Sequence, residues 1–156
     1  MKTYKILFVC LGNICRSPMA ETIMLKLVNQ IGAKNIEIDS AGIIGYHAGE
    51  KADQRMRMHA NKRGYNITHI SRPIRTSDFD EFDIIISMDD SVHDSLLDKA
   101  PSIEHETKIR KMTDFSITMC ATHVPDPYYG GSEGFEHVID LLEDSCRGLL
   151  KHIIEE

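Results

Sequence analysis

Residues 6–24 read ILFVCLGNICRSPMAETIM, and this stretch decides the fold. Its first four residues, 6–9, form an uninterrupted apolar run, which is typical of a strand buried on both faces of a parallel sheet. Ser17, a favourable N-cap, then opens a run of apolar residues at helical spacing that Gly32 ends. We therefore predict a strand and a helix joined by a short loop, residues 10–17.

The rest of the chain alternates predicted strands with predicted helices. Strands are predicted at residues 35–40, 82–88 and 108–112, and helices at residues 52–63, 89–99 and 132–154. We expect the 82–88 strand beside the first strand and the 35–40 strand near an edge, and we assign no element to residues 113–124. Such alternation predicts an α/β fold with a small, doubly wound parallel sheet.

Length and composition favour one ordinary globular domain, residues 1–156. A net charge of −6 without a basic tract argues against nucleic acid or an anionic membrane as a partner. No apolar stretch is long enough to cross a bilayer, and the first strand begins too early to leave room for a signal peptide. We therefore expect a cytoplasmic protein.

The four cysteines are Cys10, Cys15, Cys120 and Cys146, and none forms a C-x-x-C pair. A zinc site is therefore not expected, and reduced thiols fit a cytosolic enzyme. Cys120 and Cys146 are interpreted as structural. Cys15 lies in the same loop as Cys10, so it either pairs with Cys10 reversibly after oxidation or is a small packed side chain.

The loop between the first strand and helix has the composition of an anion site. Free N–H groups and the helix dipole favour an anion there, and they also stabilise a thiolate at Cys10. Arg16 adds a guanidinium that can bind two phosphate oxygens, and Gly12 and Asn13 tolerate left-handed backbone. A core cysteine and a surface arginine would explain each residue alone, but the C-x5-R-S spacing predicts an enzyme's phosphate site.

A second candidate segment is Val124-Pro125-Asp126-Pro127-Tyr128-Tyr129-Gly130-Gly131. The two prolines stiffen the backbone around Asp126, and two aromatic residues follow. A carboxyl group presented in this way suits a general acid for an aromatic leaving group. A proline-bounded turn with two exposed tyrosines is the alternative.

Two further residues have open interpretations. Tyr46 lies in a loop that should overhang Cys10, because ligands of open α/β sheets bind at the carboxyl ends of the strands. It is either a wall for an aromatic substrate or a surface tyrosine. His69 is either a hydrogen-bonding support behind the loop or a surface histidine.

The segment from Cys10 to Ser17, with the late Asp126-Pro127-Tyr128-Tyr129, resembles the low-molecular-weight protein tyrosine phosphatases. The similarity covers nearly the whole chain, including Asp39-Ser40-Ala41 and Phe82-Asp83 through Met88-Asp89. The resemblance implies a single α/β/α domain with a four-stranded parallel sheet flanked by helices, and neither a metal nor a cofactor.

The resemblance also implies a reaction, the hydrolysis of phosphotyrosine in proteins and of small aryl phosphates through a phosphocysteine intermediate. Cys10 would be the nucleophile, Arg16 the phosphate clamp and Asp126 the general acid and later base. The other residues it implies are the phosphate-binding loop Leu11, Gly12, Asn13, Ile14, Cys15 and Ser17, the loop-supporting Ser40 and His69, and the substrate walls Tyr46, Tyr128 and Tyr129. It further implies inhibition by phosphate-like oxyanions, and we expect a monomer or weak dimer.

One departure and three alternatives stand beside this hypothesis. Many relatives carry proline before the aspartate of Gly49-Glu50-Lys51-Ala52-Asp53, which leaves the shape of the substrate-wall loop open. A thiol-dependent arsenate reductase would need further relay cysteines, and an inactive phosphate-binding module would be expected to lack Cys10 or Asp126. Phosphoarginine is an alternative substrate, although Ile14 with aromatic walls favours a phenyl ring.

Overall fold

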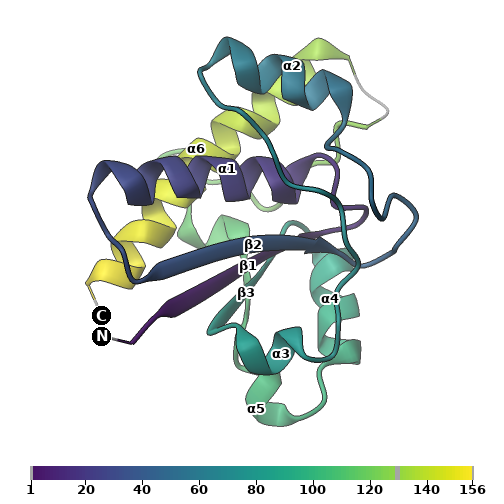
Figure 1. Ribbon diagram of the computed structural model, residues 1–156, viewed down its shortest axis with the longest axis vertical. Helices are drawn as coiled ribbons and strands as arrows, with labels where there is room; N and C mark the ends of the chain where they lie inside the picture. The colour runs from purple at the N-terminus through teal and green to yellow at the C-terminus, as the bar shows by residue number, and fades with distance from the viewer. Residues whose placement is uncertain (1, 129–130, 156) are drawn as a thin grey trace.

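The structure is a computed structural model that describes residues 2–128 and 131–155. The elements, in chain order, are β1 (Tyr4–Cys10), α1 (Arg16–Gln30), β2 (Ile36–Gly42), α2 (Gln54–Lys62), α3 (Asp78–Glu81), β3 (Ile84–Ser87), α4 (Asp90–Lys99), α5 (Ile103–Glu106), β4 (Ile109–Lys111), the 3₁₀ turn η1 (Met112–Phe115) and α6 (Ser132–Ile154). Figure 1 shows helices on both faces of one sheet.

The sheet has four parallel strands in the order β2-β1-β3-β4. The predicted fold class is therefore confirmed, as are the central place of the 82–88 strand beside β1 and the edge place of β2. All strands point the same way, so the loops that follow β1 and β2 emerge together at the carboxyl ends of the strands (Figure 1). In an open parallel sheet, ligands bind at these carboxyl ends.

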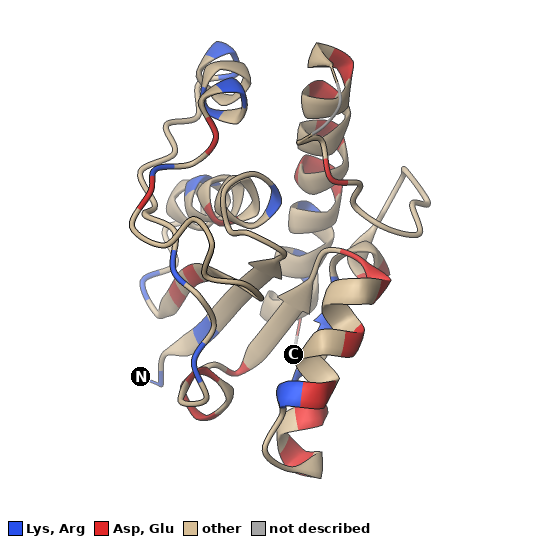
Figure 2. Ribbon diagram, turned by 90° about the vertical axis from the view of Figure 1, so that its right-hand side faces the viewer, with Lys and Arg blue, Asp and Glu red and all other residues tan. Residues whose placement is uncertain are grey.

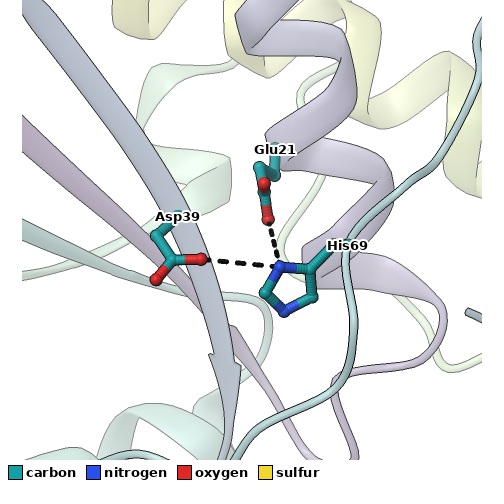
Figure 3. A group of neighbouring side chains, drawn as sticks. All are labelled: Glu21, Asp39 and His69. Atoms are coloured by element: carbon teal, nitrogen blue, oxygen red, sulfur yellow. Dashed lines mark ion pairs between the residues drawn. The ribbon is translucent and has the colours of Figure 1, made fainter. Parts of the chain in front are cut away.

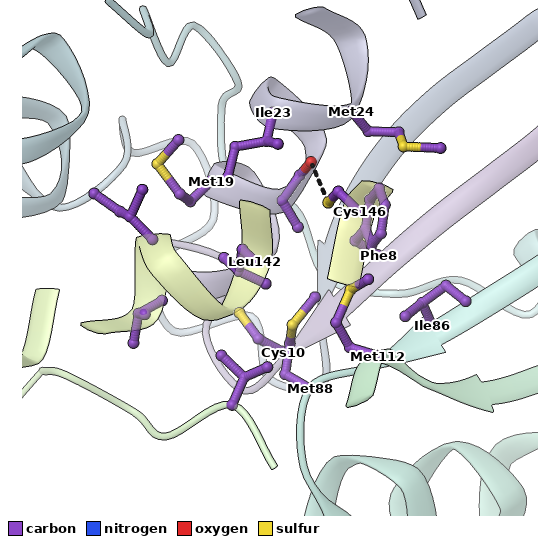
Figure 4. Close-up of a cluster of buried hydrophobic side chains, with 14 of the residues drawn as sticks. Phe8, Cys10, Met19, Ile23, Met24, Ile86, Met88, Met112, Leu142 and Cys146 are labelled. Carbon is purple, nitrogen blue, oxygen red and sulfur yellow. Dashed lines mark hydrogen bonds between the residues drawn. The ribbon is translucent and has the colours of Figure 1, made fainter. Parts of the chain in front are cut away.

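The side chains of β1 alternate between two cores. Ile6, Phe8 and Cys10 belong to a core formed mainly with α1 and α6, of which Figure 4 shows a part. Leu7 and Val9 belong to a second core beneath α3 and α4. Every one of these five residues is at most 2% exposed, because successive strand residues face opposite sides of a sheet that is covered twice.

The long C-terminal helix has the predicted bounds, but other predicted elements are shorter. α2 begins at Gln54 rather than at residue 52, because the Asp53 side chain accepts hydrogen bonds from the first free N–H groups and acts as the N-cap. β3 begins at Ile84, since Phe82 is the C-cap of α3, a short helix that the apolar pattern did not reveal. Part of the unassigned stretch forms η1.

Ion pairs join α2 to α6. Arg63, directly after α2, lies 2.8 Å from carboxylate oxygens of Glu136, Asp140 and Glu143 of α6, and His59 of α2 contacts Glu136. In Figure 2, α2 carries Lys and Arg residues in blue, and α6 carries Asp and Glu residues in red. The pairs stabilise the orientation of α2, whose first turn adjoins the loop that follows β1.

Two of the cysteines differ from each other in their surroundings. Cys146 is fully buried in α6 and its thiol contacts the Ala20 carbonyl, which confirms a structural place. Cys120 is exposed and has a φ of 49°, so packing does not explain it and its structural interpretation is wrong.

Among residues 2–128 and 131–155, no helix combines the length and the apolar character that spanning a bilayer requires.

Gly148 of α6 gives a test of the packing between α6 and η1. A Cβ at this position would lie 1.8 Å from the carbonyl oxygen of Phe115. We predict that Gly148→Ala lowers the free energy of unfolding by about 2–4 kcal/mol, because backbone must move to relieve the overlap. Gly134→Ala in the same helix is the control, since its Cβ would meet Pro127 at an ordinary 3.7 Å. Equal denaturant midpoints for both variants would contradict the predicted packing.

Candidate active site

The loop between β1 and α1 is held from outside through its carbonyl groups. Four of these carbonyls accept hydrogen bonds from three neighbouring segments: the loop after β2, the residue before α2 and the segment after α2. The bonds run from Ile43 N to Cys10 O (3.0 Å), from Ile44 N to Leu11 O (3.0 Å), from Ser71 Oγ to Gly12 O (3.1 Å) and from Asp53 N to Ile14 O (2.8 Å). The backbone of the loop is therefore joined to three neighbouring segments.

Ser17 contacts the Cys10 thiol instead of capping the helix. α1 begins at Arg16 with Cys15 at the N-cap position and no side-chain cap, so the predicted N-cap role of Ser17 is wrong. The Ser17 hydroxyl lies 3.0 Å from Cys10 Sγ, and it accepts a hydrogen bond from Asn13 Nδ2 at 2.8 Å. A thiolate has no proton to give, so Ser17 would be the donor to an ionised Cys10.

Asn13 is the centre of a buried hydrogen-bond network. Its φ of 59° confirms the predicted left-handed backbone. Its amide nitrogen also donates to Ser40 Oγ at 3.0 Å. Its oxygen accepts from the Arg72 backbone N–H (3.0 Å) and lies 2.8 Å from His69 Nε2, which must therefore be the protonated nitrogen.

These contacts place Ser40 and His69 behind the loop, as expected of supporting residues, and His69 is not a plain surface histidine. Gly12 is different from the expectation, because it is absent from the residues with positive φ. A Cβ there would lie 3.2 Å from the His47 ring, so close packing is the reason for glycine.

The Arg16 guanidinium is buried and fixed. Its Nη1 lies 2.6 Å from Asp89 Oδ2 and donates to the Val124 carbonyl at 3.0 Å. Burial disfavours its charge, but the neighbouring Cys10 and Asp89 more than compensate and raise the pKa of Arg16 above its ordinary value. Arg16 therefore remains a cation at the floor of the site.

Asp126 lies near Arg16 and lines the same pocket. Its Oδ2 lies 3.7 Å from Arg16 Nη2, and its Oδ1 accepts from the Tyr128 backbone N–H at 3.0 Å. Arg55 holds this segment through a 2.8 Å hydrogen bond to the Tyr128 carbonyl, and it is itself paired with Asp53 at 3.2 Å. The Asp126 segment is thus joined to the start of α2.

A pocket of about 340 Å³ lies above the loop. It brings together the predicted residues Cys10, Leu11, Gly12, Ile14, Cys15, Arg16, Tyr46, Asp126 and Tyr128, and it adds Ile44 and His47. Tyr46 therefore lies at the pocket, although it is 81% exposed. Tyr129, the other predicted substrate wall, lies outside the described residues.

The two loop cysteines have different surroundings. Burial raises the pKa of the Cys15 thiol, and the negative charges of Asp53, Cys10 and Asp126 raise it further. Cys15 is therefore a neutral thiol near pH 7, whereas the Cys10 sulfur has the Ser17 hydroxyl beside it. Both cysteines are free thiols.

A sequence model of the family described as "Low molecular weight phosphotyrosine protein phosphatase" matches residues 5–156. The chain belongs to this family. The expected enzyme class is thereby confirmed: the protein is a low molecular weight protein tyrosine phosphatase.

Solved structures and relatives agree with this assignment. A protein tyrosine phosphatase of Entamoeba histolytica, crystallised with Hepes in the active site, is 49% identical, with a TM-score of 0.95 over 98% of both chains. A low molecular weight phosphotyrosine protein phosphatase of Drosophila melanogaster is 38% identical over 97% of this chain and 98% of its own. A Drosophila arginine phosphatase is 31% identical, with a TM-score of 0.89 over 98% of both chains.

Behind the phosphatase loop, His69 lies between two carboxylates (Figure 3). Its Nδ1 is 3.1 Å from Glu21 Oε1 and 3.5 Å from Asp39 Oδ1. These are the ligand atoms that, among the described residues, come close enough to hold a metal ion. Arg72 already donates to Asp39 at 3.0 Å, however, and a proton between Glu21 and His69 satisfies both groups, so we assign no metal to the phosphatase.

Burial determines where this proton lies. It raises the pKa of Glu21 to about 7, and it lowers the pKa of His69 despite the nearby Asp39. The carboxyl group of Glu21 therefore keeps a proton at pH values where an exposed glutamate has lost it. The Ser40 hydroxyl, which bonds Asn13, also contacts Glu21 Oε1 at 2.6 Å, so this proton is joined to the loop network.

Four residues at the phosphatase site were not predicted in these roles. Asp89 stands at the start of the predicted 89–99 helix and caps α4 by accepting a hydrogen bond from Val92 N, but it also binds Arg16. Arg55 belongs to the predicted 52–63 helix, and Ile44 and His47 flank Tyr46 in its loop. The sequence patterns that indicate helix caps and loops involve neighbouring residues only, whereas these contacts join segments far apart in the chain.

The raised pKa of Glu21 predicts a pH-dependent stability. A carboxyl whose folded pKa is raised stabilises the fold fully below its unfolded pKa near 4.5, and this contribution is lost as the pH rises through about 7. Between pH 5 and pH 8 we expect Glu21→Gln to gain up to about 3 kcal/mol in unfolding free energy relative to the wild type.

The measurement is the thermal midpoint of both proteins across this pH range. Glu37→Gln on β2 is the matched control, because the Glu37 side chain is 62% exposed. A difference between wild type and Glu21→Gln that stays constant from pH 5 to pH 8 would refute the assignment of the proton.

Proposed function

We propose that the protein hydrolyses phosphotyrosine in proteins, and small aryl phosphates, through a phosphocysteine intermediate. The observation that carries the proposal is one pocket lined by Cys10, Arg16 and Asp126, which are a nucleophile, a cation and a proton donor. The four free thiols suit a reducing compartment, and we propose a cytoplasmic enzyme that is monomeric or weakly dimeric.

The phosphate group would bind within the loop. The loop carbonyls are bound on the outside, which supports N–H groups directed inward at the start of α1, where the helix dipole favours an anion. Asp89 and Val124 hold the Nη1 end of the Arg16 guanidinium. The Nε–Nη2 edge would then bind two phosphate oxygens in parallel.

The first chemical step is a transfer of the phosphoryl group to sulfur. The Cys10 thiolate, stabilised by the Ser17 hydroxyl, attacks phosphorus, and the S–P bond forms as the P–O bond to the tyrosine ring breaks. Protonated Asp126 gives its proton to the departing phenolate oxygen. Asp126 is 39% exposed and lines the pocket, which supports access to the leaving group.

The second step releases phosphate. Asp126, now a carboxylate, takes a proton from a water molecule whose oxygen attacks phosphorus, and the S–P bond breaks to return the Cys10 thiolate. Arg16 would stabilise the charge on the phosphoryl oxygens in both steps. Phosphate-like oxyanions should compete for the same loop.

Pocket composition favours phosphotyrosine over phosphoarginine. Ile14 with Tyr46 and Tyr128 offers apolar and aromatic surface to a phenyl ring. Because a similar structure is named an arginine phosphatase, the deciding experiment compares hydrolysis of matched peptides that carry phosphotyrosine, phosphoserine or phosphoarginine. We expect phosphotyrosine to be hydrolysed fastest, and a preference for phosphoarginine would overturn the substrate assignment.

Cys10→Ser tests the nucleophile. We predict loss of all measurable turnover of p-nitrophenyl phosphate, because a serine hydroxyl is far less acidic than a thiol and does not supply the anion that attacks phosphorus. Binding of orthovanadate or inorganic phosphate, followed by calorimetry, should persist because the loop is unchanged. Cys120→Ser is the control, since Cys120 is exposed and absent from the pocket lining. Turnover that survives in Cys10→Ser would exclude a phosphocysteine.

Asp126→Ala tests the proton donor. We predict that kcat/KM for phenyl phosphate, which has a poor leaving group, falls by about 10²-fold or more, while kcat/KM for p-nitrophenyl phosphate falls far less. The reason is that only the more basic oxygen needs a proton in order to depart. The comparison uses kcat/KM because this constant reports the first step and excludes the hydrolysis of the phosphocysteine, which both substrates share. Equal losses for the two substrates would remove Asp126 from the role of general acid.

A further inference from the structure

Three large side chains are exposed together beside the mouth of the pocket. Leu11 is 43% exposed, Ile44 44% and Tyr46 81%. We call these three residues the rim patch. Leu11 follows β1 and the other two follow β2, and the hydrogen bond from Ile44 N to Leu11 O joins the two segments. Apolar side chains gathered on a surface in this way mark a place of interaction.

The rim patch is continuous with the reaction site. All three of its residues line the same pocket as Cys10 and Asp126. A phosphotyrosine whose phosphate reaches Cys10 must bring its neighbouring peptide residues to the pocket edge. A bound phosphotyrosine peptide would therefore place the residues that flank the phosphotyrosine beside the rim patch.

The charged groups near this edge already have partners. His47 Nδ1 lies 3.2 Å from Glu50 Oε1, and the His47 ring packs against Tyr46 with ring centroids 4.9 Å apart. Arg55 is paired with Asp53. The rim therefore offers a flanking residue apolar surface rather than an unpaired charge, and apolar surface selects an apolar side chain.

We propose that the rim patch binds a large apolar side chain next to the phosphotyrosine, so that the preferred substrates are proteins with leucine-like residues flanking the phosphorylated tyrosine. This inference rests on the proposed function. The apolar neighbour gains affinity because it and Ile44 leave water together, whereas a polar neighbour of the same size does not.

The test compares two phosphotyrosine peptides that differ only in having Leu or Asn on both sides of the phosphotyrosine. Both residues are uncharged and of similar size. We expect the wild-type kcat/KM to favour the Leu peptide by about 5-fold, and we expect Ile44→Ser to bring the ratio close to 1. Ile103→Ser is the matched control, since Ile103 lies on α5, is 77% exposed and does not line the pocket, and it should keep the wild-type ratio.

The outcomes separate the two proposals. If the wild type hydrolyses neither peptide, the proposed function fails, and p-nitrophenyl phosphate turnover measured in parallel shows whether the enzyme was intact. If it hydrolyses both peptides equally, only the rim-patch proposal is overturned. Sedimentation of wild type and Ile44→Ser gives a last outcome. If the wild type is a dimer that Ile44→Ser dissociates, and the ratio between the two peptides does not change, the rim patch binds a second copy of this chain. That result would overturn the proposal.

Discussion

The buried side chain of Asn13 is the contact on which the active-site loop depends. Its one amide group binds the hydroxyls of Ser17 and Ser40, the His69 ring and the backbone of Arg72. These partners come from α1, β2 and the segment after α2, so a single residue joins three parts of the chain. A left-handed backbone is unfavourable for a residue with a side chain, and these hydrogen bonds compensate for it.

The network also orients the nucleophile. Asn13 donates to the Ser17 oxygen, which leaves the Ser17 proton free to point at the Cys10 sulfur or at the Ala41 carbonyl, 3.5 Å away. The nearer of the two acceptors is the sulfur. The glutamate–histidine pair behind the loop extends the same chain of polar groups, and these partly buried groups satisfy one another by hydrogen bonding.

Much of this arrangement could be predicted from the sequence because its signals are local. The apolar run of β1, the periodic α6 and the C-x5-R-S spacing each lie within one short stretch. The proline-bounded Asp126 is also a local signal, but turns of this composition are common, so its assignment as a general acid depends on the resemblance to the family. The fold class followed from the alternation of such segments, and the structure and its similar solved structures confirm it.

Contacts between distant segments could not be predicted in this way. Asp89 already had a sufficient local explanation as a cap, so nothing indicated its contact with Arg16. Ser17 differs from Asp89, because its residue type strongly favours a helix cap, yet its hydroxyl contacts Cys10 and does not cap α1. Arg55 and Ile44 have ordinary sequence surroundings, and only the packing of α2 and of the loop after β2 brings them to the pocket.

The difference between the tightly bound loop and its exposed edge has a consequence for how such a protein can diverge. Moving any loop carbonyl or the Asn13 amide would break several buried hydrogen bonds at once, so substitutions there are selected against whatever the substrate. Leu11, Ile44 and Tyr46 contribute little to the folded core, since much of each already contacts water. Mutation can therefore sample new targets at the edge while the chemistry stays constant beneath it.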